Sequence, residues 1–344
     1  MISATHARGA ALNVFAVAAV VVAGLLVVGK NLPRAPDGQA LVNVSYDPTR
    51  ELYRDVNQAF AAAHGGPVTI RQSHGGSSRQ ARAVIAGAPA DVVTLALRSD
   101  IEALRRHGLI ADGWSARLPN DSVPYTSTIV FVVRRGNPRH IRDFADLVAP
   151  GVSIVTPNPK TSGNGKLSFL AAWGSVLARG GSDADARAFV TQLYQHAAIL
   201  DSGAREATLR FTQEKIGDVQ LTWENEALYE VDEAKGDLEL VRPPASIRAE
   251  PCVAWVDANV ARNGTQALAR QYLAFLYSDA AQALAAKHGY RPIAPAALAG
   301  ARDRLPPMSL FTIGSIARDW EDAQRRFFDD DGLFDAIYPP RHAP

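Results

Sequence analysis

The sequence has few of the residue patterns that metalloproteins need. Its 344 residues contain one cysteine, Cys252, so neither an intramolecular disulfide nor a cysteine-based metal cluster can form. No two of the eight histidines have the spacing of a metal-binding H-E-x-x-H motif. We therefore interpret Cys252 as a small buried apolar residue, and we expect neither a metal nor a cofactor.

The chain also lacks an excess of charge of either sign. It has 36 Lys and Arg residues against 35 Asp and Glu residues, which gives a formal net charge of +1. A nucleic-acid-binding surface requires a basic face, so we exclude nucleic acid as a partner. A small anion is compatible with this balance, because helix dipoles and backbone N–H groups bind anions without a formal cation.

Two catalytic patterns are incomplete in this sequence. The segment 113–117 (Gly-Trp-Ser-Ala-Arg) lacks the final glycine of the G-x-S-x-G nucleophile elbow. The Gly-Lys pair at 165–166 resembles the end of a phosphate-binding P-loop, but Leu167 replaces the required Ser or Thr. A hydrolase that uses Ser77 or Ser162 would lack an evident base partner, so we predict that the protein is not an enzyme.

A long apolar run stands near the N-terminus. Residues 10–29 are apolar except for Asn13, Arg8 precedes them, and a Pro-containing linker follows at 31–40. The run is close to the roughly 20 residues that a membrane-spanning helix needs, and no clear cleavage site follows it. We therefore interpret residues 1–40 as an export signal plus linker, with the apolar run either removed or kept as a membrane anchor. Either outcome places the body of the protein outside the cytoplasm.

From residue 41 onward, β-like and helical segments alternate. Strands are predicted at 41–45, 68–71, 91–95, 128–133, 153–155 and 218–222, with an extended segment at 249–256. Helices are predicted at 48–63, 78–86, 165–177, 265–288 and 315–327. This alternation predicts an α/β protein of two lobes with parallel sheets, joined by two extended crossings. Ligands of such sheets bind at the carboxyl ends of the strands, so we expect a site in the cleft between the lobes.

Four short segments place Ser, Gly, Asn or Asp where a helix follows a strand. They are 45–48, 74–78, 161–164 and 201–205. Each should present unpaired backbone N–H groups at the positive end of a helix, and such ends bind small oxyanions. Ordinary capping would also explain any one of these corners, and a single tryptophan such as Trp223 is more often a core residue. Residue types alone therefore leave the function open.

The same corners carry a resemblance to a known family. The segments 43–52 (NVSYDPTREL), 72–77 (QSHGGS), 90–97 (ADVVTLAL) and 156–163 (TPNPKTSG) resemble successive signatures of the periplasmic sulfate-binding proteins. The segments 201–205 (DSGAR), 223–228 (WENEAL) and 310–313 (LFTI) continue the match. The motifs occur in the order of that family, and together they cover about residues 41–340.

The resemblance implies a two-lobed type II periplasmic-binding-protein fold. We expect lobe 1 at 41–124 and 252–300, lobe 2 at 125–251, and a C-terminal helical segment at 301–344 that packs on both. It also implies a periplasmic solute-binding protein, with or without an inner-membrane tether. This protein would capture sulfate, or thiosulfate, and deliver it to the permease and ATPase subunits of an ABC importer. The alternatives are a binding protein for molybdate, tungstate or phosphate and, more remotely, a serine hydrolase.

The resemblance further implies a binding site composed of neutral hydrogen-bond donors. They are the backbone N–H groups of Asp47, Ser77, Gly163, Asn164 and Ala204, the hydroxyl and backbone of Ser162, and the indole Nε1–H of Trp223. Sulfate has only acceptors at neutral pH, whereas phosphate keeps a proton and would gain from a carboxylate. A buried acceptor facing sulfate would be left unpaired, so the Asp47 carboxylate should turn back to cap its own helix. We expect a monomer that closes on its ligand at hinges near 122–128 and 247–251.

Overall fold

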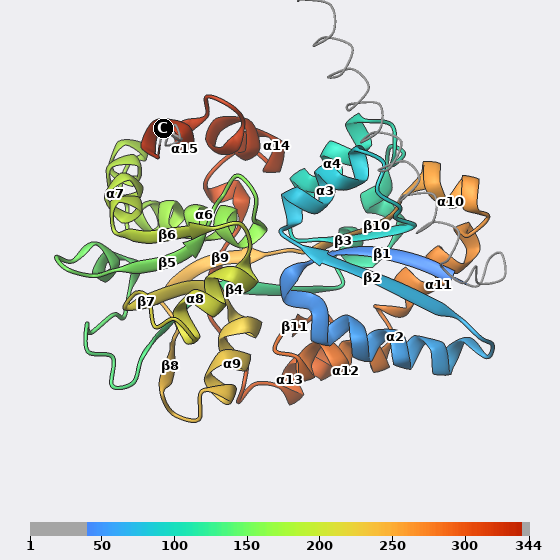
Figure 1. Cartoon of the computed structure of the whole chain (residues 1–344), viewed down its shortest axis with the longest axis horizontal. Helices are drawn as coiled ribbons and strands as arrows, with labels where there is room; N and C mark the ends of the chain where they lie inside the picture. Colours follow the sequence, from blue (N-terminus) through green and yellow to red (C-terminus); the bar gives the residue numbers. More distant parts are fainter. Residues whose placement is uncertain (1–39, 339–344) are drawn as a thin grey trace, which may run out of the picture. The chain divides into compact units, whose positions relative to one another are not determined.

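A computed structural model describes residues 40–338 of the chain. The predicted export segment at 1–40 lies outside the described residues except for its last residue, Ala40. Within residues 40–338, no helix combines the length and the apolar character that crossing a bilayer requires. The described part of the chain contains two β-sheets, each covered by helices (Figure 1).

The first sheet has four strands in the order β10-β3-β1-β2. Their bounds are β1 (Ala40–Tyr46), β2 (Thr69–Gly75), β3 (Val92–Leu95) and β10 (Cys252–Trp255). β1 pairs in parallel with β2 and β3, whereas β10 is antiparallel to β3. Helices α3 (Ser77–Ile85) and α4 (Arg98–Arg106) lie on one face, and α2 (Arg50–His64) and α11 (Gln266–Phe275) lie on the other (Figure 1). All four residues of β3 are therefore buried, and all except Thr94 are apolar.

The second sheet runs in the order β12-β9-β4-β7-β5-β6, and β8 and β11 also pair with β4. Its strands are β4 (Tyr125–Arg134), β5 (Ile154–Pro157), β6 (Ala197–Asp201), β7 (Val219–Trp223), β8 (Leu238–Val241), β9 (Ala245–Ala249), β11 (Arg291–Pro292) and β12 (Ser309–Phe311). β5 is parallel to β6 and β7, whereas β4 is antiparallel to β7. Helices α6 (Gly163–Ala178) and α7 (Asp183–Gln195) lie on one side, and α8 (Ala204–Thr212) and α9 (Glu224–Glu233) lie on the other (Figure 1).

Shorter elements complete the described chain. The remaining α-helices are α5 (Pro119–Ser122), α10 (Asp257–Asn263), α12 (Asp279–Lys287), α13 (Pro295–Gly300), α14 (Trp320–Ala323) and α15 (Leu333–Ile337). Four 3₁₀ helices span Asp47–Thr49, Trp114–Arg117, Phe144–Val148 and Ile313–Ser315, and a π-helical turn spans Gln324–Phe328. We call the first sheet with its covering helices lobe 1, and the second sheet with its covering helices lobe 2. The predicted two-lobed α/β architecture is thus confirmed. The sheets were predicted to be parallel but are mixed, because β10 and β4 run antiparallel to their neighbours.

Two predicted helices are wrong in their extent. The helix expected at 265–288 is two helices, α11 and α12, because Ser278 begins a new helix by accepting a hydrogen bond from Ala281 N at 3.3 Å. The helix expected at 315–327 begins only at Trp320, since the Asp319 side chain caps it by accepting from Asp322 N at 2.7 Å. Both errors come from capping residues that end an otherwise helix-like pattern.

Aromatic residues attach the C-terminal part of the chain to lobe 2. The ring of Phe327 lies 5.4 Å from that of Phe169 and 4.9 Å from that of Trp173, both on α6. On the same helix, Gly174 leaves the space that the Phe311 ring of β12 occupies. Burial of these large rings stabilises the segment by several kcal/mol in rough terms.

Candidate anion-binding site

One small cavity of about 160 Å³ lies where strands of both lobes end. Its lining contains all seven residues expected from the sequence, namely Asp47 and Ser77 of lobe 1 and Ser162, Gly163, Asn164, Ala204 and Trp223 of lobe 2. Tyr46, Pro48 and Gly76 also line it. Sequence reasoning did not name these three as site residues, although each lies inside a recognised motif next to a residue that was named.

The strand ends explain why these residues meet. β1, β2, β5 and β6 each lead within a few residues into a helix whose first residues line the cavity, and β7 ends at the lining residue Trp223. The first N–H groups of a helix have no acceptor inside that helix, and the helix dipole makes this end positive. Four such ends around one cavity form a concentrated set of neutral donors.

The first corner differs from the prediction. Tyr46 is the N-cap residue, and Asp47 begins the 3₁₀ helix, so Asp47 does not cap its own helix. The turn is instead closed by Thr49, whose hydroxyl donates to Tyr46 O at 2.7 Å. Asp47 Oδ1 accepts from Arg50 Nη2 at 3.0 Å. Its Oδ2 is buried without a hydrogen-bond partner and faces lobe 2, where a Cβ on Gly203 would lie 2.6 Å from it.

This environment alters the acidity of Asp47. Burial raises the pKa of its carboxyl group above the usual value, and the hydrogen bond and charge of Arg50 oppose that rise. The negative charge of Glu206 on α8 raises the pKa further. Protonation of Asp47 therefore removes a negative charge from the cavity wall at a higher pH than for an exposed aspartate.

The second corner presents only its backbone. Ser77 Oγ donates to Asp100 Oδ2 at 2.5 Å and accepts from Ala96 N at 3.0 Å. Because the hydroxyl is committed to these partners, the backbone N–H of Ser77 is the donor left for the cavity, in agreement with its expected role. A Cβ on the preceding Gly76 would lie 2.6 Å from Thr161 O of lobe 2, so a larger residue there would push the lobes apart.

The third corner has one donor fewer than predicted. The backbone N–H of Ser162 donates to Asn158 O at 3.0 Å and is not available to a ligand. Ser162 Oγ accepts from Gly165 N at 3.5 Å as the N-cap of α6, which leaves its hydroxyl hydrogen for the cavity. The Asn164 side chain turns away, since its Nδ2 donates to Leu221 O at 3.5 Å. The backbone of Asn164 is helical and has no positive φ.

Trp223 supplies the most distinctive group of the cavity. It is fully buried at the end of β7, and its ring centroid lies 5.3 Å from that of Tyr46 across the two lobes. Its Nε1–H has no hydrogen-bond partner among residues 40–338. A buried unpaired donor costs roughly 1–3 kcal/mol, so a ligand acceptor at this place would recover that energy.

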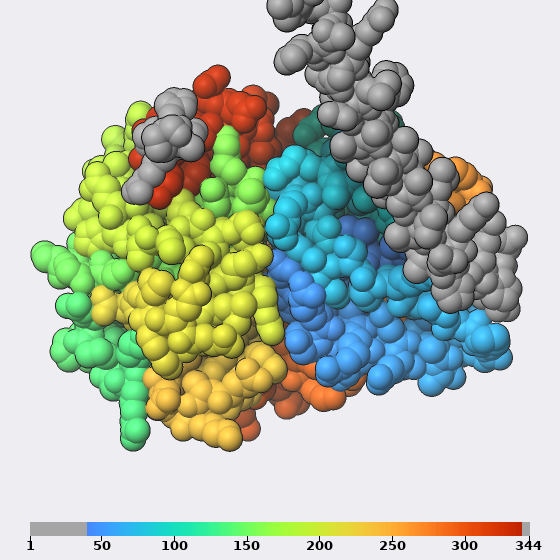
Figure 2. Space-filling model, viewed as in Figure 1, coloured from blue at the N-terminus to red at the C-terminus, as the bar shows by residue number. Residues whose placement is uncertain are grey.

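No lysine or arginine is among the residues that line the cavity. Lys166, which follows the third corner, directs its Nζ to Gln324 Oε1 at 2.7 Å and lies 3.6 Å from Asp100 Oδ1. The lobes contact each other where Ala96 and Ser77 approach Gly163, since a Cβ on Gly163 would lie 2.5 Å from Ala96 Cβ and 3.2 Å from Ser77 Cβ. Figure 2 shows the surfaces of the two lobes touching. The cavity therefore has helix N-termini and no formal positive charge in its lining.

A two-lobed α/β fold with a cavity between its lobes is typical of solute-binding proteins, and comparison with known proteins gives the family. The chain belongs to the bacterial extracellular solute-binding protein family, whose model matches residues 41–291. The sulfate-binding protein SubI from Mycobacterium tuberculosis superimposes with a TM-score of 0.78 at 33% identity, covering 85% of this chain and 100% of that one. A periplasmic thiamin-binding protein shares the fold with a TM-score of 0.66 at 19% identity. The fold is therefore the predicted type II periplasmic-binding-protein fold.

Sequence relatives are similar over nearly their whole length. A thiosulfate-binding protein of Pseudomonas aeruginosa is 46% identical over 325 residues, which cover 92% of this chain and 98% of the relative. A sulfate-binding protein of Salmonella typhimurium is 49% identical over 303 residues, covering 86% of this chain and 92% of the relative. These relatives are solute-binding proteins, in line with the prediction that the chain is not an enzyme.

Proposed function

We propose that this protein captures sulfate, or thiosulfate, outside the cytoplasm and delivers it to an ABC importer. The observation that carries the proposal is the cavity in which the unpaired Nε1–H of Trp223 meets helix N-termini from both lobes. The names of the relatives at 46% and 49% identity support the choice of ligand.

The chemistry of the lining favours sulfate over phosphate. The seven proposed contacts are the backbone N–H groups of Asp47, Ser77, Gly163, Asn164 and Ala204, the hydroxyl of Ser162 and the indole of Trp223. All of them donate, and sulfate accepts at all four oxygens. Phosphate near neutral pH carries a proton, and the only carboxylate in the cavity lining that could accept it is that of Asp47. Arg50 engages Oδ1 of this group, and Oδ2 lies against Gly203, which does not line the cavity, so we expect phosphate to bind more weakly.

The proposed lobe boundaries follow the expected ones. β4 begins at Tyr125, β9 ends at Ala249 and β10 begins at Cys252, which supports lobes at 41–124 with 252–300 and at 125–251. β11 is an exception, since it pairs with β4 of lobe 2. Arg106 of α4 pairs with Glu321 at 2.9 Å, and Lys160 pairs with Asp335 at 2.7 Å, so the C-terminal segment contacts both lobes. We further propose that the protein acts as a monomer whose closed form is recognised by permease and ATPase subunits.

Calorimetric titration with sulfate, thiosulfate, molybdate and phosphate tests the proposed ligand. We expect sulfate or thiosulfate to bind with a dissociation constant of about 1 μM or lower, corresponding to roughly 8 kcal/mol. Added salt should change this affinity little, because dipolar donors in a closed cavity are screened less than surface cations. Preferential binding of molybdate or phosphate would contradict the proposed ligand.

Mass spectrometry of exported protein shows whether residues 1–40 are removed or kept as a tether.

A further inference from the structure

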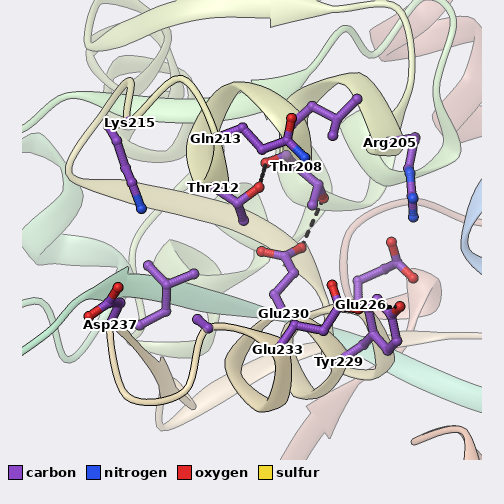
Figure 3. Close-up of a pocket in the computed structure, with 13 residues that line it drawn as sticks. Arg205, Thr208, Thr212, Gln213, Lys215, Glu226, Tyr229, Glu230, Glu233 and Asp237 are labelled. Carbon is purple, nitrogen blue, oxygen red and sulfur yellow. Dashed lines mark hydrogen bonds between the residues drawn. The ribbon is translucent and has the colours of Figure 1, made fainter.

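A second pocket lies in lobe 2 between α8 and α9, and it shares no lining residue with the anion cavity. Its empty volume, including the open mouth, is about 790 Å³. Figure 3 shows the charges divided between two walls. Arg205 and Lys215 stand on the wall of α8 and the segment after it, and the opposite wall carries Glu226, Glu230, Glu233 and Asp237.

Glu230 is the buried centre of this pocket. Its residue surface is only 4% exposed, and its Oε1 accepts hydrogen bonds from Thr208 Oγ1 at 2.9 Å and Gln220 Nε2 at 3.1 Å. Its Oε2 is buried and has no partner in the described part of the chain. Figure 3 shows the Glu230 carboxyl group between the two walls, bonded to Thr208 on one side. One acceptor oxygen is therefore left for a ligand.

Apolar groups flank the same opening. Leu209 on α8 is 36% exposed and Tyr229 on α9 is 41% exposed, which makes them the large hydrophobic side chains exposed among residues 40–338. Both line this pocket, from opposite walls. Exposed apolar groups gathered at one opening mark a place where an apolar ligand body would be covered.

We propose that this pocket binds a small organic ammonium ion with an apolar body. The ammonium group donates to Glu230 Oε2, and the apolar body lies between Leu209 and Tyr229. The group left for the ligand, Glu230 Oε2, accepts hydrogen bonds when the carboxyl group is ionised, and a positively charged donor stabilises that ionised form, which favours a cation over an anion. In the described part of the chain, no group of three or more acidic, His or Cys side chains is arranged to hold a metal ion, which favours an amine over an inorganic cation.

Binding of an ammonium ion is coupled to a proton. Burial raises the pKa of Glu230 to about 8, although Thr208, Gln220 and Arg205 act in the opposite direction. The carboxyl group is therefore mostly protonated at pH 7, and it loses its proton to the buffer when the ammonium ion arrives. The charged groups that face Glu230 across or along the pocket are Arg205, Lys215, Glu226, Glu233 and Asp237.

The test is calorimetric titration of the full chain with 2-phenylethylammonium chloride. Its neutral analogue 2-phenylethanol and its anionic analogue phenylacetate serve as control ligands. We expect saturable binding of the amine alone, and a loss of about tenfold or more in affinity in Glu230→Gln. The matched control Asp232→Asn removes a carboxylate from an exposed position of α9 outside the pocket lining and should change affinity less than about threefold. Sulfate titration of both variants verifies that they are folded.

Proton release gives an independent readout. At pH 7 the binding enthalpy of the amine in the wild type should vary with the ionisation enthalpy of the buffer, whereas in Glu230→Gln it should not. Absence of amine binding, equal binding of all three ligands, or equal affinity in Glu230→Gln and the wild type would each overturn the proposal. Failure here leaves the anion site untouched, because sulfate binding is measured on the same samples.

Discussion

At the scale of single residues, the anion cavity depends on one side-chain donor that no other residue of the lining can replace. Trp223 is the only lining residue that brings an indole N–H, and it lies at the contact between the lobes against Tyr46. Its ring fills space as a core residue does, and its unpaired Nε1–H separates a binding role from a packing role.

Trp223→Phe separates these two roles. The phenyl ring still fills most of the space, but one sulfate oxygen loses its donor, so sulfate affinity should fall by about 1–3 kcal/mol. Calorimetry gives the affinity, and the thermal unfolding midpoint without ligand is the control for packing. A variant that binds sulfate as well as the wild type would show that Trp223 is a core residue only.

Asp47 should make sulfate binding dependent on pH. Its pKa is raised by burial, and sulfate remains a dianion at mildly acidic pH, so protonation of Asp47 removes a repulsive charge while the ligand is unchanged. Sulfate affinity should therefore rise as pH falls through the raised pKa of Asp47 and then level off. In the isosteric variant Asp47→Asn, sulfate affinity should not change with pH in this way. Calorimetry from pH 4 to 8 measures both proteins. An affinity that falls with pH in the wild type contradicts this role.

At the scale of elements, helix α6 brings its first residue into van der Waals contact with the other lobe. A Cβ on Gly163 would lie 2.5 Å from Ala96 Cβ, which is closer than two carbon atoms can approach. The contact therefore requires glycine because of space, and the backbone of Gly163 is not in the left-handed region.

Gly163→Ala should hold the lobes apart at this point. We expect sulfate affinity to drop about tenfold or more, because the donors of lobe 1 and lobe 2 no longer reach the anion together. The matched control is Gly66→Ala, where an added Cβ meets no atom within 4 Å. Calorimetry measures the affinity of both variants, and unchanged binding in Gly163→Ala would show that the lobes can accommodate the methyl group.

Sequence predicted the elements around the cavity because each has a local signal. Segments such as 161–164 join a strand to a helix with capping residues, and that geometry points backbone donors to a known edge of the sheet. The sequence does not predict the position of the Asp47 side chain, because Thr49 closes the turn in its place and Arg50 binds its carboxylate. The pocket around Glu230 was missed for a similar reason. Its two walls come from α8 and α9, and the periodicity of the sequence does not show how these two helices pack against each other.

At the scale of the whole molecule, a buried ion pair joins the two lobes. Lys166 Nζ of α6 lies 3.6 Å from Asp100 Oδ1 of α4, and both side chains are about 5% exposed or less. Asp100 also accepts from the hydroxyls of Ser77 and Ser78 at 2.5 and 2.8 Å. Of these contacts, only that of Lys166 with Asp100 crosses between the lobes, so this pair stabilises the closed form.

Lys166→Met should weaken sulfate binding without unfolding either lobe. The loss of the pair costs the closed form about 1–2 kcal/mol, a value kept modest because the serine hydroxyls still satisfy Asp100. The matched control Lys287→Met breaks the pair with Asp55, which lies between α2 and α12. Calorimetry with sulfate compares the two, and equal effects would show that the Lys166 pair has no role in closure.

Sulfate should shift the protein from an open to a closed form. The proposed donors divide between the lobes, so neither lobe alone can satisfy four oxygens, and the anion gains most of its hydrogen bonds on closure. Small-angle scattering should show a smaller radius of gyration with sulfate than without it, with the bending at 122–128 and 247–251. If the ligand-free protein already has the closed radius, the hinge mechanism is incorrect.

The burial of the anion cavity has a consequence for the speed of exchange. All ten residues that line it are buried, so a bound anion has no route to solvent while the lobes are together. The dissociation rate then cannot exceed the rate at which the lobes part, whichever anion is inside. Sulfate and thiosulfate should therefore share the same upper limit on their release rates even if their affinities differ. A transporter that pulls the lobes apart would shorten the residence time of both ligands alike.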